Sequence, residues 1–213
     1  MKKFAVLGSG DVARVLAGGL KKHGYEVRMG ARSPEKLKEF SAQSGIPVNP
    51  PGEAAAWAEG IFLAVLGRAA TEALQGAGAA NLRGKLVVDA TNPISEGAPV
   101  DGVLSYYTDN NKSQMEELQE RFPEARFVKA FNSVGSPLMV NPPFQGARPT
   151  MFYCGNDAQA KAAVAAVIDQ FGWDGADMGT AAAARAIEPL CRLWCIPGFR
   201  QNEWRHAFHL LKV

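Results

Sequence analysis

Short apolar runs alternate along the chain with longer segments in which apolar residues recur at helical spacing. The runs predict strands at residues 3–7, 25–30, 46–48, 61–66, 85–90 and 127–131, and then at 150–154 and 174–178. Strands that alternate with helices in this way form a parallel sheet with helices on both faces. The predicted fold class is therefore a doubly wound, mainly parallel α/β sheet, and its first six strands match the count of a complete dinucleotide-binding sheet.

Residues 151–213 are predicted to extend a nucleotide-binding domain formed by residues 1–150. The extension holds a helix at 158–171 and two final helices at 180–195 and 201–213. The large apolar side chains of the final helices are Leu190, Leu193, Trp194, Ile196, Phe199, Trp204, Phe208 and Leu211. They exceed what two peripheral helices need, which predicts a homodimer interface that also closes the crevice; a simple intramolecular cap is the alternative.

Local signals mark helix ends and one unusual connection. His23 and Gly24 supply a cation and a glycine at the end of the first helix, so His23 is interpreted as a cap residue. Ser113 and Glu116 form a capping box at the start of a later helix. Residues 93–112 show little periodicity, and a loop of that length in a compact domain usually has a function.

The stretch VLGSGDVA joins the first strand to the first helix. Gly8 stands where a side chain would obstruct a tight turn, Gly10 lets the backbone approach a pyrophosphate, and Ala13 lets the helix lie close to the sheet. The helix then presents its unpaired N–H groups to the phosphates. A glycine-rich turn that only connects strand and helix is the alternative, but the whole pattern predicts a Rossmann-type dinucleotide site. The predicted cofactor-binding residues of this turn are Gly8, Ser9, Gly10, Asp11 and Val12.

The end of the second strand indicates which dinucleotide is bound. An NAD site usually carries Asp or Glu there for the ribose 2′-hydroxyl, whereas this chain has Gly30 and Ala31. Arg32, Ser33 and Lys36 instead offer donors and positive charge, which suits the 2′-phosphate of NADP(H). Ser33 is also a candidate helix N-cap, and a solvated surface lysine is the alternative for Lys36.

Composition excludes several classes of function. Hydrophobic residues make up 47% of the chain, and the formal net charge is +2 with no basic run beyond a pair of lysines, which argues against nucleic-acid binding. The longest strongly apolar stretch, IFLAVL, is far too short for a membrane span. Three cysteines without a CxxC pattern suggest neither disulfides nor zinc, so buried thiols in a cytoplasmic protein are expected.

Several stretches spread over nearly the whole chain carry a family resemblance. They are VLGSGDVA, MGARSPEKL, VVDATNPI, VKAFNSVG and GADMGTAAAARAIEPL, of which the DATNP and KAFN portions are the most specific. With them the chain resembles the NADP-dependent oxidoreductases that use coenzyme F-420, a deazaflavin. It is also similar to the NADPH-binding domains of Steap-type metalloreductases.

The resemblance implies which residues line the inner part of the crevice. It implies that the loop after the fourth strand passes beside the cofactor and that the two strand ends with TNP and AFNS face the nicotinamide. The crevice beyond these strand ends is also where ligands bind in such sheets. Asn92 is equally well interpreted as part of an Asn-Pro turn. The implied residues are Leu66, Gly67, Thr91, Asn92, Pro93, Ala130, Phe131 and Asn132.

The expected reaction is hydride transfer between NADPH and a deazaflavin, a flavin or a similar acceptor. Such a reaction needs positioned carbons and excluded water, so no catalytic acid or base is predicted, and Asn92 and Asn132 are only crevice candidates. A ferric chelate or a small imine or carbonyl compound is an alternative acceptor. Dimerisation is also implied by the resemblance.

Other polar residues are interpreted structurally. Lys129, internal to a strand, is expected at a sheet edge or in an ion pair before any catalytic role. His206 and His209 form an HxxH spacing on the last predicted helix, where packing is favoured over metal binding. Arg185 and Glu188 are expected to pair with each other on a helix surface.

A different class of function fits the same residues. The protein would then be a redox sensor that binds NADPH and signals through a partner without turnover. Residues 93–112 would be its docking surface, with Tyr106 and Tyr107 as an exposed aromatic patch. Steady-state oxidation of NADPH with any acceptor separates the two classes.

Overall fold

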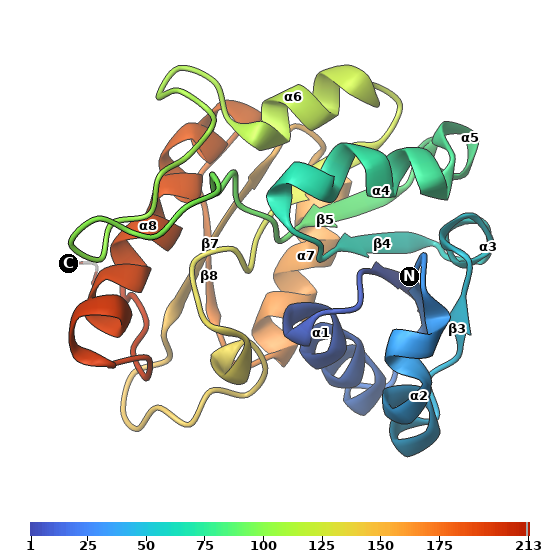
Figure 1. Ribbon diagram of the computed structural model, residues 1–213, viewed down its shortest axis with the longest axis horizontal. Coiled ribbons are helices and arrows are strands. Elements are labelled where there is room, and N and C mark those ends of the chain that lie inside the picture. Colours follow the sequence, from blue (N-terminus) through green and yellow to red (C-terminus); the bar gives the residue numbers. More distant parts are fainter. Residues whose placement is uncertain (212) are drawn as a thin grey trace.

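The strands form one twisted sheet through the middle of the molecule. A computed structural model describes residues 1–211 and 213. Its strands are β1 (Lys3–Leu7), β2 (Glu26–Gly30), β3 (Val48–Asn49), β4 (Gly60–Leu63), β5 (Leu86–Asp89), β6 (Arg126–Lys129), β7 (Thr150–Gly155) and β8 (Asp174–Asp177). In the described residues they make one eight-stranded sheet in the order β3-β2-β1-β4-β5-β6-β7-β8, in which only β6 and β7 pair antiparallel (Figure 1). The predicted α/β fold class is confirmed.

Helices cover both faces of this sheet. They are α1 (Asp11–Lys22), α2 (Lys38–Ser44), α3 (Pro51–Trp57), α4 (Ala70–Ala77), α5 (Ala79–Leu82), α6 (Gln114–Arg121), α7 (Ala158–Gln170) and α8 (Ala184–Gln201). The buried residues fall into two clusters: α1 and α7 pack on one face, and α3 to α6 with the start of α8 pack on the other. The sheet continues across residue 150, since Val128 pairs with Gly155, and the division of the chain at that residue stays a prediction.

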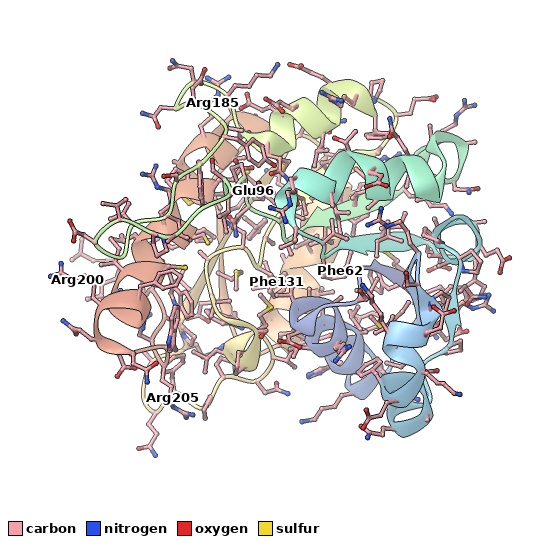
Figure 2. The ribbon with its side chains drawn as sticks, viewed as in Figure 1. Phe62, Glu96, Phe131, Arg185, Arg200 and Arg205 are labelled. Atoms are coloured by element: carbon pink, nitrogen blue, oxygen red, sulfur yellow. The ribbon has the colours of Figure 1, made fainter. Side chains whose placement is uncertain are left out.

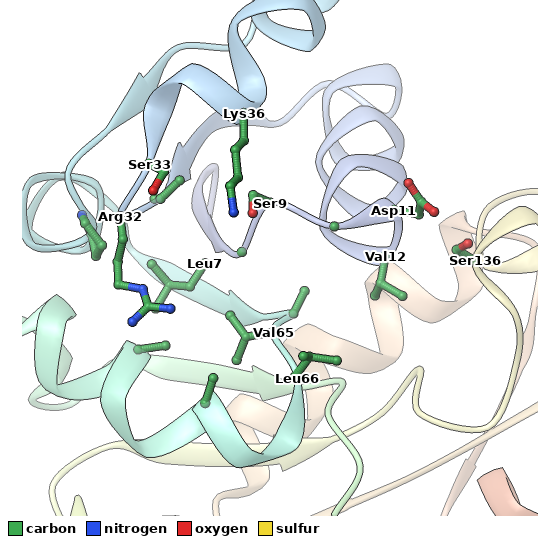
Figure 3. Close-up of a pocket in the computed structure, with 18 residues that line it drawn as sticks. Leu7, Ser9, Asp11, Val12, Arg32, Ser33, Lys36, Val65, Leu66 and Ser136 are labelled. Atoms are coloured by element: carbon green, nitrogen blue, oxygen red, sulfur yellow. The ribbon is translucent and has the colours of Figure 1, made fainter. Parts of the chain in front are cut away.

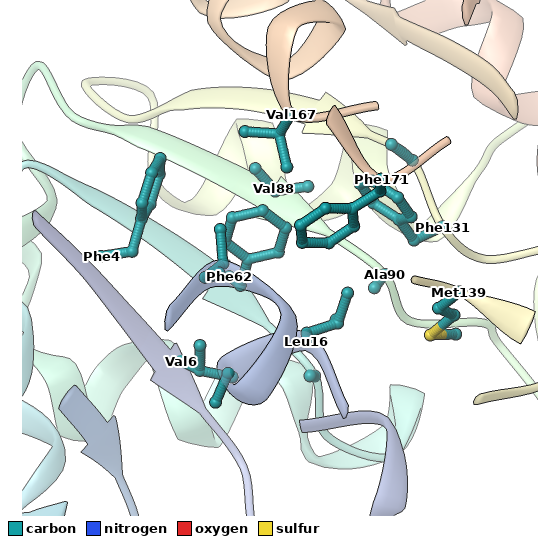
Figure 4. Close-up of a cluster of buried hydrophobic side chains, with 14 of the residues drawn as sticks. Phe4, Val6, Leu16, Phe62, Val88, Ala90, Phe131, Met139, Val167 and Phe171 are labelled. Carbon is teal, nitrogen blue, oxygen red and sulfur yellow. The ribbon is translucent and has the colours of Figure 1, made fainter. Parts of the chain in front are cut away.

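Aromatic rings occupy the centre of the core on the α1 and α7 face. Phe62 lies 5.4 Å from Phe4 and 6.2 Å from Phe131, and Phe131 lies 5.7 Å from Phe171, measured between ring centroids (Figure 4). Figure 2 shows Phe62 and Phe131 in the middle of the molecule and charged side chains such as Arg205 at its rim. The predicted apolar strands therefore deliver their side chains to a packed interior.

Predicted boundaries shift by a few residues where a turn begins early. The strand expected at 61–66 ends at Leu63. Leu66 is already the N-cap of the short 3-10 helix Gly67–Ala69, so the chain leaves the sheet earlier than its apolar run suggests. The loop at 93–112 is irregular as expected, with isolated bridges between Ile94 and Tyr106 and between Val100 and Val103. The capping box at Ser113 is confirmed, and His23 is the C-cap of α1.

The prediction of a final helix at 201–213 is wrong. Gln201 is instead the last residue of α8, Asn202 adopts a left-handed φ of 55°, and residues 202–211 contain no helix; residue 212 of that prediction lies outside the described residues. The segment runs back past the start of β7, where the Thr150 amide donates to the Phe208 carbonyl at 2.8 Å. Backbone pairing with a distant strand thus replaces the helical pairing that the apolar spacing suggested.

Near the C-terminal end His206 is a packed side chain, whereas His209 is exposed and contacts the backbone. The His206 ring stacks on Trp194 with centroids 4.9 Å apart, and His209 Nδ1 lies 2.9 Å from the Arg148 carbonyl oxygen. The three cysteines are free thiols, of which Cys195 alone is only partly buried. Within residues 1–211 and 213, no helix combines the length and the apolar character that crossing a membrane requires.

Candidate functional site

A cavity of about 600 Å³ opens at the carboxyl ends of β1, β2 and β4. One wall comes from the turn after β1 and the segment after β2, and the other from the segment after β4 and the start of α4 (Figure 3). Its lining residues are Leu7, Gly8, Ser9, Gly10, Asp11, Val12, Gly30, Ala31, Arg32, Ser33, Lys36, Pro51, Ala64, Val65, Leu66, Ala69, Ala73 and Ser136. The structure therefore brings together the predicted residues Gly8–Val12, Arg32, Ser33, Lys36 and Leu66.

The glycine turn at the cavity floor fits a dinucleotide phosphate. A Cβ atom on Gly8, whose φ is +139°, would come within 2.2 Å of the Ala64 carbonyl oxygen, so the turn itself requires this glycine. A Cβ on Gly10 would meet nothing within 4 Å, so the space beside it is free for a ligand. Gly10 is the N-cap of α1, and among the described residues no side chain caps this helix. The amides of its first turn are therefore available to an anion.

Cationic side chains stand at the other end of the cavity. Arg32 and Lys36 both extend from the segment after β2 toward the cavity (Figure 3). Arg14 on α1 donates to the Lys36 carbonyl oxygen at 3.0 Å and so holds that segment against the helix. Arg32 pairs with Glu72 on α4 at 2.5 Å. Ser33 is the N-cap of the 3-10 helix Pro34–Leu37 without a capping hydrogen bond from its side chain to a described residue.

The remaining predicted residues do not line the cavity. They are Gly67, Thr91, Asn92, Pro93, Ala130, Phe131 and Asn132, of which Thr91, Pro93 and the last three are buried. Asn92 Nδ2 donates to the Asn132 carbonyl at 2.8 Å, and Asn132 Nδ2 donates to Asn92 Oδ1 at 3.0 Å. A Cβ on Gly67 would come within 2.0 Å of the Asn92 carbonyl oxygen. The three loops implied by the resemblance are thus in contact with one another.

Two features single out the end of β6. Phe131 has a φ of 61°, a left-handed conformation that is strained for a residue with a side chain. The next residue, Asn132, is buried, and its Oδ1 has no hydrogen-bond partner among the described residues. Backbone strain and an unpaired buried acceptor both cost stability and concentrate at functional sites.

A buried charge cluster supports the ends of β5 and β6. Lys129 is 0% exposed, and its Nζ lies 2.8 Å from Asp89 Oδ2 and 2.9 Å from Glu188 Oε1 on α8. It also donates to the Thr91 carbonyl at 2.7 Å. Burial by itself would lower the pKa of Lys129, but the attraction of the two carboxylates raises the pKa above its ordinary value. Lys129 therefore belongs to a structural ion pair, one of its two expected roles, and not to a sheet edge.

The cluster continues to α6 and to the 93–112 loop. Glu188 accepts from the amides of Gln114 and Met115 in the first turn of α6, at 3.0 and 3.1 Å. Gln114 in turn donates to the Thr91 hydroxyl at 2.6 Å and accepts from the Tyr107 hydroxyl at 2.5 Å. Burial and the nearby charge of Glu188 raise the pKa of Tyr107 to about 12, so its phenol remains a donor near neutral pH.

The expected pairing of Arg185 with Glu188 is wrong. Arg185 binds Glu116 on α6 through two nitrogens, with Arg185 Nη2 2.6 Å from Glu116 Oε1. Glu188 faces the opposite way, toward Lys129 in the interior. Spacing along one helix made the pair possible, but the packing of α8 on α6 offered each side chain a stronger partner.

Sequence reasoning missed four polar residues of the site. Asp89, Gln114 and Glu188 complete the buried cluster, and Ser136 lines the cavity on the side of Asp11 (Figure 3). Asp89 had a signal, because an acid within the apolar run VVDA requires a buried partner. Glu188 and Gln114 had none, since their partners are far away in the chain.

Relatives with curated descriptions match the chain over most of its length. It is 32% identical over 199 residues to Metalloreductase STEAP3 of Rattus norvegicus, covering 92% of this chain and 38% of that protein. It is 28% identical over 189 residues to Metalloreductase STEAP2 of Homo sapiens, covering 87% and 35%. The chain thus spans little more than a third of the length of these relatives.

Solved structures match the fold as a whole. A protein from Arthrobacter sp. FB24, inferred to be an F420-dependent NADP-reductase, has a TM-score of 0.92 at 34% identity, with 100% of each chain covered. An imine reductase from Streptomyces aurantiacus has a TM-score of 0.70 at 17% identity, covering 93% of this chain and 63% of that one. At that lower identity the likeness shows the fold alone.

The family assignment agrees with the position of the cavity. The sequence model of the family described as NADP oxidoreductase, coenzyme F420-dependent, matches residues 3–93, which include the glycine turn, Arg32 and the start of the TNP loop. The Arthrobacter structure extends the match over the full chain. The chain belongs to the coenzyme F420-dependent NADP oxidoreductase family.

Proposed function

We propose that this NADP-dependent oxidoreductase transfers hydride between NADPH and a deazaflavin or flavin acceptor. The observation that carries the proposal is the cavity itself. One end has an uncapped helix N-terminus beside Gly10. The other has Arg32 and Lys36, just after Gly30 and Ala31, where an NAD site would have an acid. This order of groups matches the order of pyrophosphate and adenosine 2′-phosphate in NADP(H).

The protein's own residues have mainly binding roles in this proposal. When bound, NADPH supplies the hydride. The first-turn amides of α1 would hold the pyrophosphate, and Arg32, Ser33 and Lys36 would hold the 2′-phosphate. No side chain is required to take up or release a proton during hydride transfer itself.

An extended, planar acceptor is favoured by the exposed apolar rim of the cavity. Leu66 lines the cavity and is nevertheless 66% exposed, and it stands near Val12 on the facing wall (Figure 3). A ring system that stacks on the nicotinamide would cover this apolar surface. The similarity to metalloreductases makes a ferric chelate the second candidate acceptor.

Steady-state kinetics tests the proposal. NADPH oxidation is followed at 340 nm with coenzyme F-420, FMN, FAD or ferric citrate as acceptor, and each assay is repeated with NADH. Turnover with F-420 or a flavin, faster with NADPH than with NADH, is the expected result. Turnover with ferric citrate alone would reject the proposed acceptor. NADPH binding without turnover of any acceptor would favour the alternative of an NADPH-responsive sensor.

We also propose a homodimer that uses the outer face of α8. Leu193 and Phe199 on this helix are 54% and 46% exposed, and the 93–112 loop adds the exposed Val100. Exposed apolar side chains gathered on one element favour a partner surface over solvent. Light scattering should give the mass of a dimer, and a double substitution of Leu193 and Phe199 by Asp should give a folded monomer. A wild-type monomer at micromolar concentration would reject the dimer.

A further inference from the structure

An ion pair joins the two walls of the cavity near its cationic end. Arg32 Nη1, from the wall formed after β2, lies 2.5 Å from Glu72 Oε1 on α4, in the opposite wall. Glu72 is flanked by Ala69 and Ala73, which both line the cavity. In Figure 3 the Arg32 side chain extends across the cavity toward this helix. The pair therefore lies where the adenosine end of a dinucleotide would have to enter.

The pair is exposed and therefore easy to exchange. The side chains of Arg32 and Glu72 are 68% and 61% exposed, and their contact uses one nitrogen and one oxygen. Exposed pairs of this kind contribute little free energy, because solvent screens both charges. A phosphate dianion that binds a guanidinium through two nitrogens is a stronger partner than a single carboxylate oxygen. A 2′-phosphate can accordingly displace Glu72, although with some loss of its own binding free energy.

Repulsion adds to this competition. A 2′-phosphate bound to Arg32 would lie beside the Glu72 carboxylate unless that side chain rotated away, and like charges at short range disfavour binding. NADH carries a hydroxyl at this position, so it meets neither the competition nor the repulsion. Glu72 thus weakens the binding of NADP(H) and leaves the binding of NAD(H) unchanged.

Resting on the proposed function, we infer that Glu72 is a specificity-determining residue: its carboxylate competes with the 2′-phosphate of NADP(H) for Arg32 and so limits the preference for NADP(H) over NAD(H). The wild-type protein releases NADP(H) more readily than its cations alone would allow.

The experiment compares full-length wild type with Glu72→Gln by calorimetric titration of NADPH and NADH. The amide keeps the shape of the side chain and removes its charge. Glu72→Gln should bind NADPH about two- to fivefold more tightly, the range set by an exposed ion pair, and should bind NADH with unchanged affinity. Glu96→Gln is the matched control, because Glu96 also forms an exposed pair, with Arg68 and not with Arg32, and its substitution should change neither affinity.

Repeating the Glu72→Gln substitution in an Arg32→Ala background tests whether the change in NADPH affinity depends on Arg32. If Glu72 competes for Arg32, the gain from Glu72→Gln should shrink or vanish in this background. A full gain there would overturn the competition, and so would an unchanged or weaker affinity of Glu72→Gln for NADPH in the wild-type background. The outcomes are distinguishable from failure of the proposed function, which would appear as wild-type protein that binds neither NADPH nor NADH.

Discussion

Along the cavity, from the glycine turn to Arg32, the candidate ligand groups come from two short contiguous stretches of the chain and are open to solvent. Beneath the inner end, the polar groups come from β5, β6, α6, α8 and the 93–112 loop, and they are buried. The first region has uncapped helix amides and exposed cations, of which Arg32 is held only by its exposed pair with Glu72, whereas the second satisfies nearly all its groups internally. Binding groups and supporting groups are therefore separated in space.

The difference has a physical origin. A ligand-binding charge has to stay accessible and exchange partners, which keeps it near water, where each contact is weak. A supporting cluster such as Lys129 with Asp89 and Glu188 gains rigidity in the interior, but each charge there depends on its partner. Substitutions in the supporting region should thus change stability, and substitutions in the binding region should change affinity.

The largest effect is expected for Lys129→Met. This change leaves the carboxylates of Asp89 and Glu188 buried without their cation, which should destabilise the fold by about 3–5 kcal/mol. Chemical denaturation measures the loss. Lys112→Met, which breaks the exposed pair with Glu120, is the control and should cost less than about 1 kcal/mol. Equal losses in the two variants would contradict the buried-cluster interpretation.

Gly10→Val should abolish dinucleotide binding and leave the fold intact. The added side chain enters the open space beside Gly10, where a Cβ would meet nothing within 4 Å, and so obstructs the pyrophosphate. Gly8→Val should instead disrupt the fold, because its Cβ would clash with the Ala64 carbonyl oxygen. Circular dichroism and titration with NADPH separate the two outcomes. An NADPH affinity of Gly10→Val within about twofold of wild type, where tenfold is about 1.4 kcal/mol, would move the phosphate site elsewhere.

Arg32→Ala should remove most of the preference for NADPH. Wild type is expected to bind NADPH at least tenfold more tightly than NADH, since a charge-assisted hydrogen bond contributes about 1.5–3 kcal/mol. The variant should lose NADPH affinity, keep NADH affinity, and unfold within about 1 kcal/mol of wild type because its pair with Glu72 is exposed. Isothermal titration with both cofactors checks this. Equal wild-type affinities would remove the basis for the NADP(H) assignment at Arg32.

The smallest effect is expected for the pH dependence of stability, through the pair of Arg185 with Glu116 at the surface of the supporting region. The Arg185 guanidinium beside Glu116 lowers the pKa of that carboxyl from 4.5 to about 2. Because the pKa is lower in the folded state, this contribution is complete above about pH 4.5 and is lost as the pH falls toward 2. Arg185→Ala should therefore flatten the acid dependence of the unfolding free energy by at most about 1 kcal/mol. If Arg185→Ala leaves the fall of the unfolding free energy below pH 4.5 unchanged, the pair of Arg185 with Glu116 does not contribute to that fall.

The C-terminal segment illustrates where prediction from the sequence failed. Its apolar spacing fits a helix, yet residues 202–211 form hydrogen bonds with β7 and pack His206 on Trp194. Periodicity identifies which side chains share a face only if the backbone is helical, and a distant strand edge can supply the backbone partners instead. The Arg185 and Glu188 pairing failed for the same reason, because both side chains found partners on other elements.

The sequence by itself determined the order of strands and helices, the glycine turn and the cationic segment after β2. These depend on interactions within a few residues, such as the φ of Gly8, the N-terminus of α1 and the absence of an acid at Gly30. Tertiary structure alone decided the burial of Lys129 between Asp89 and Glu188, and the reach of Arg32 to Glu72. Those contacts join segments 40 or more residues apart, and their free energies depend on distances and burial that exist only after the sheet has assembled.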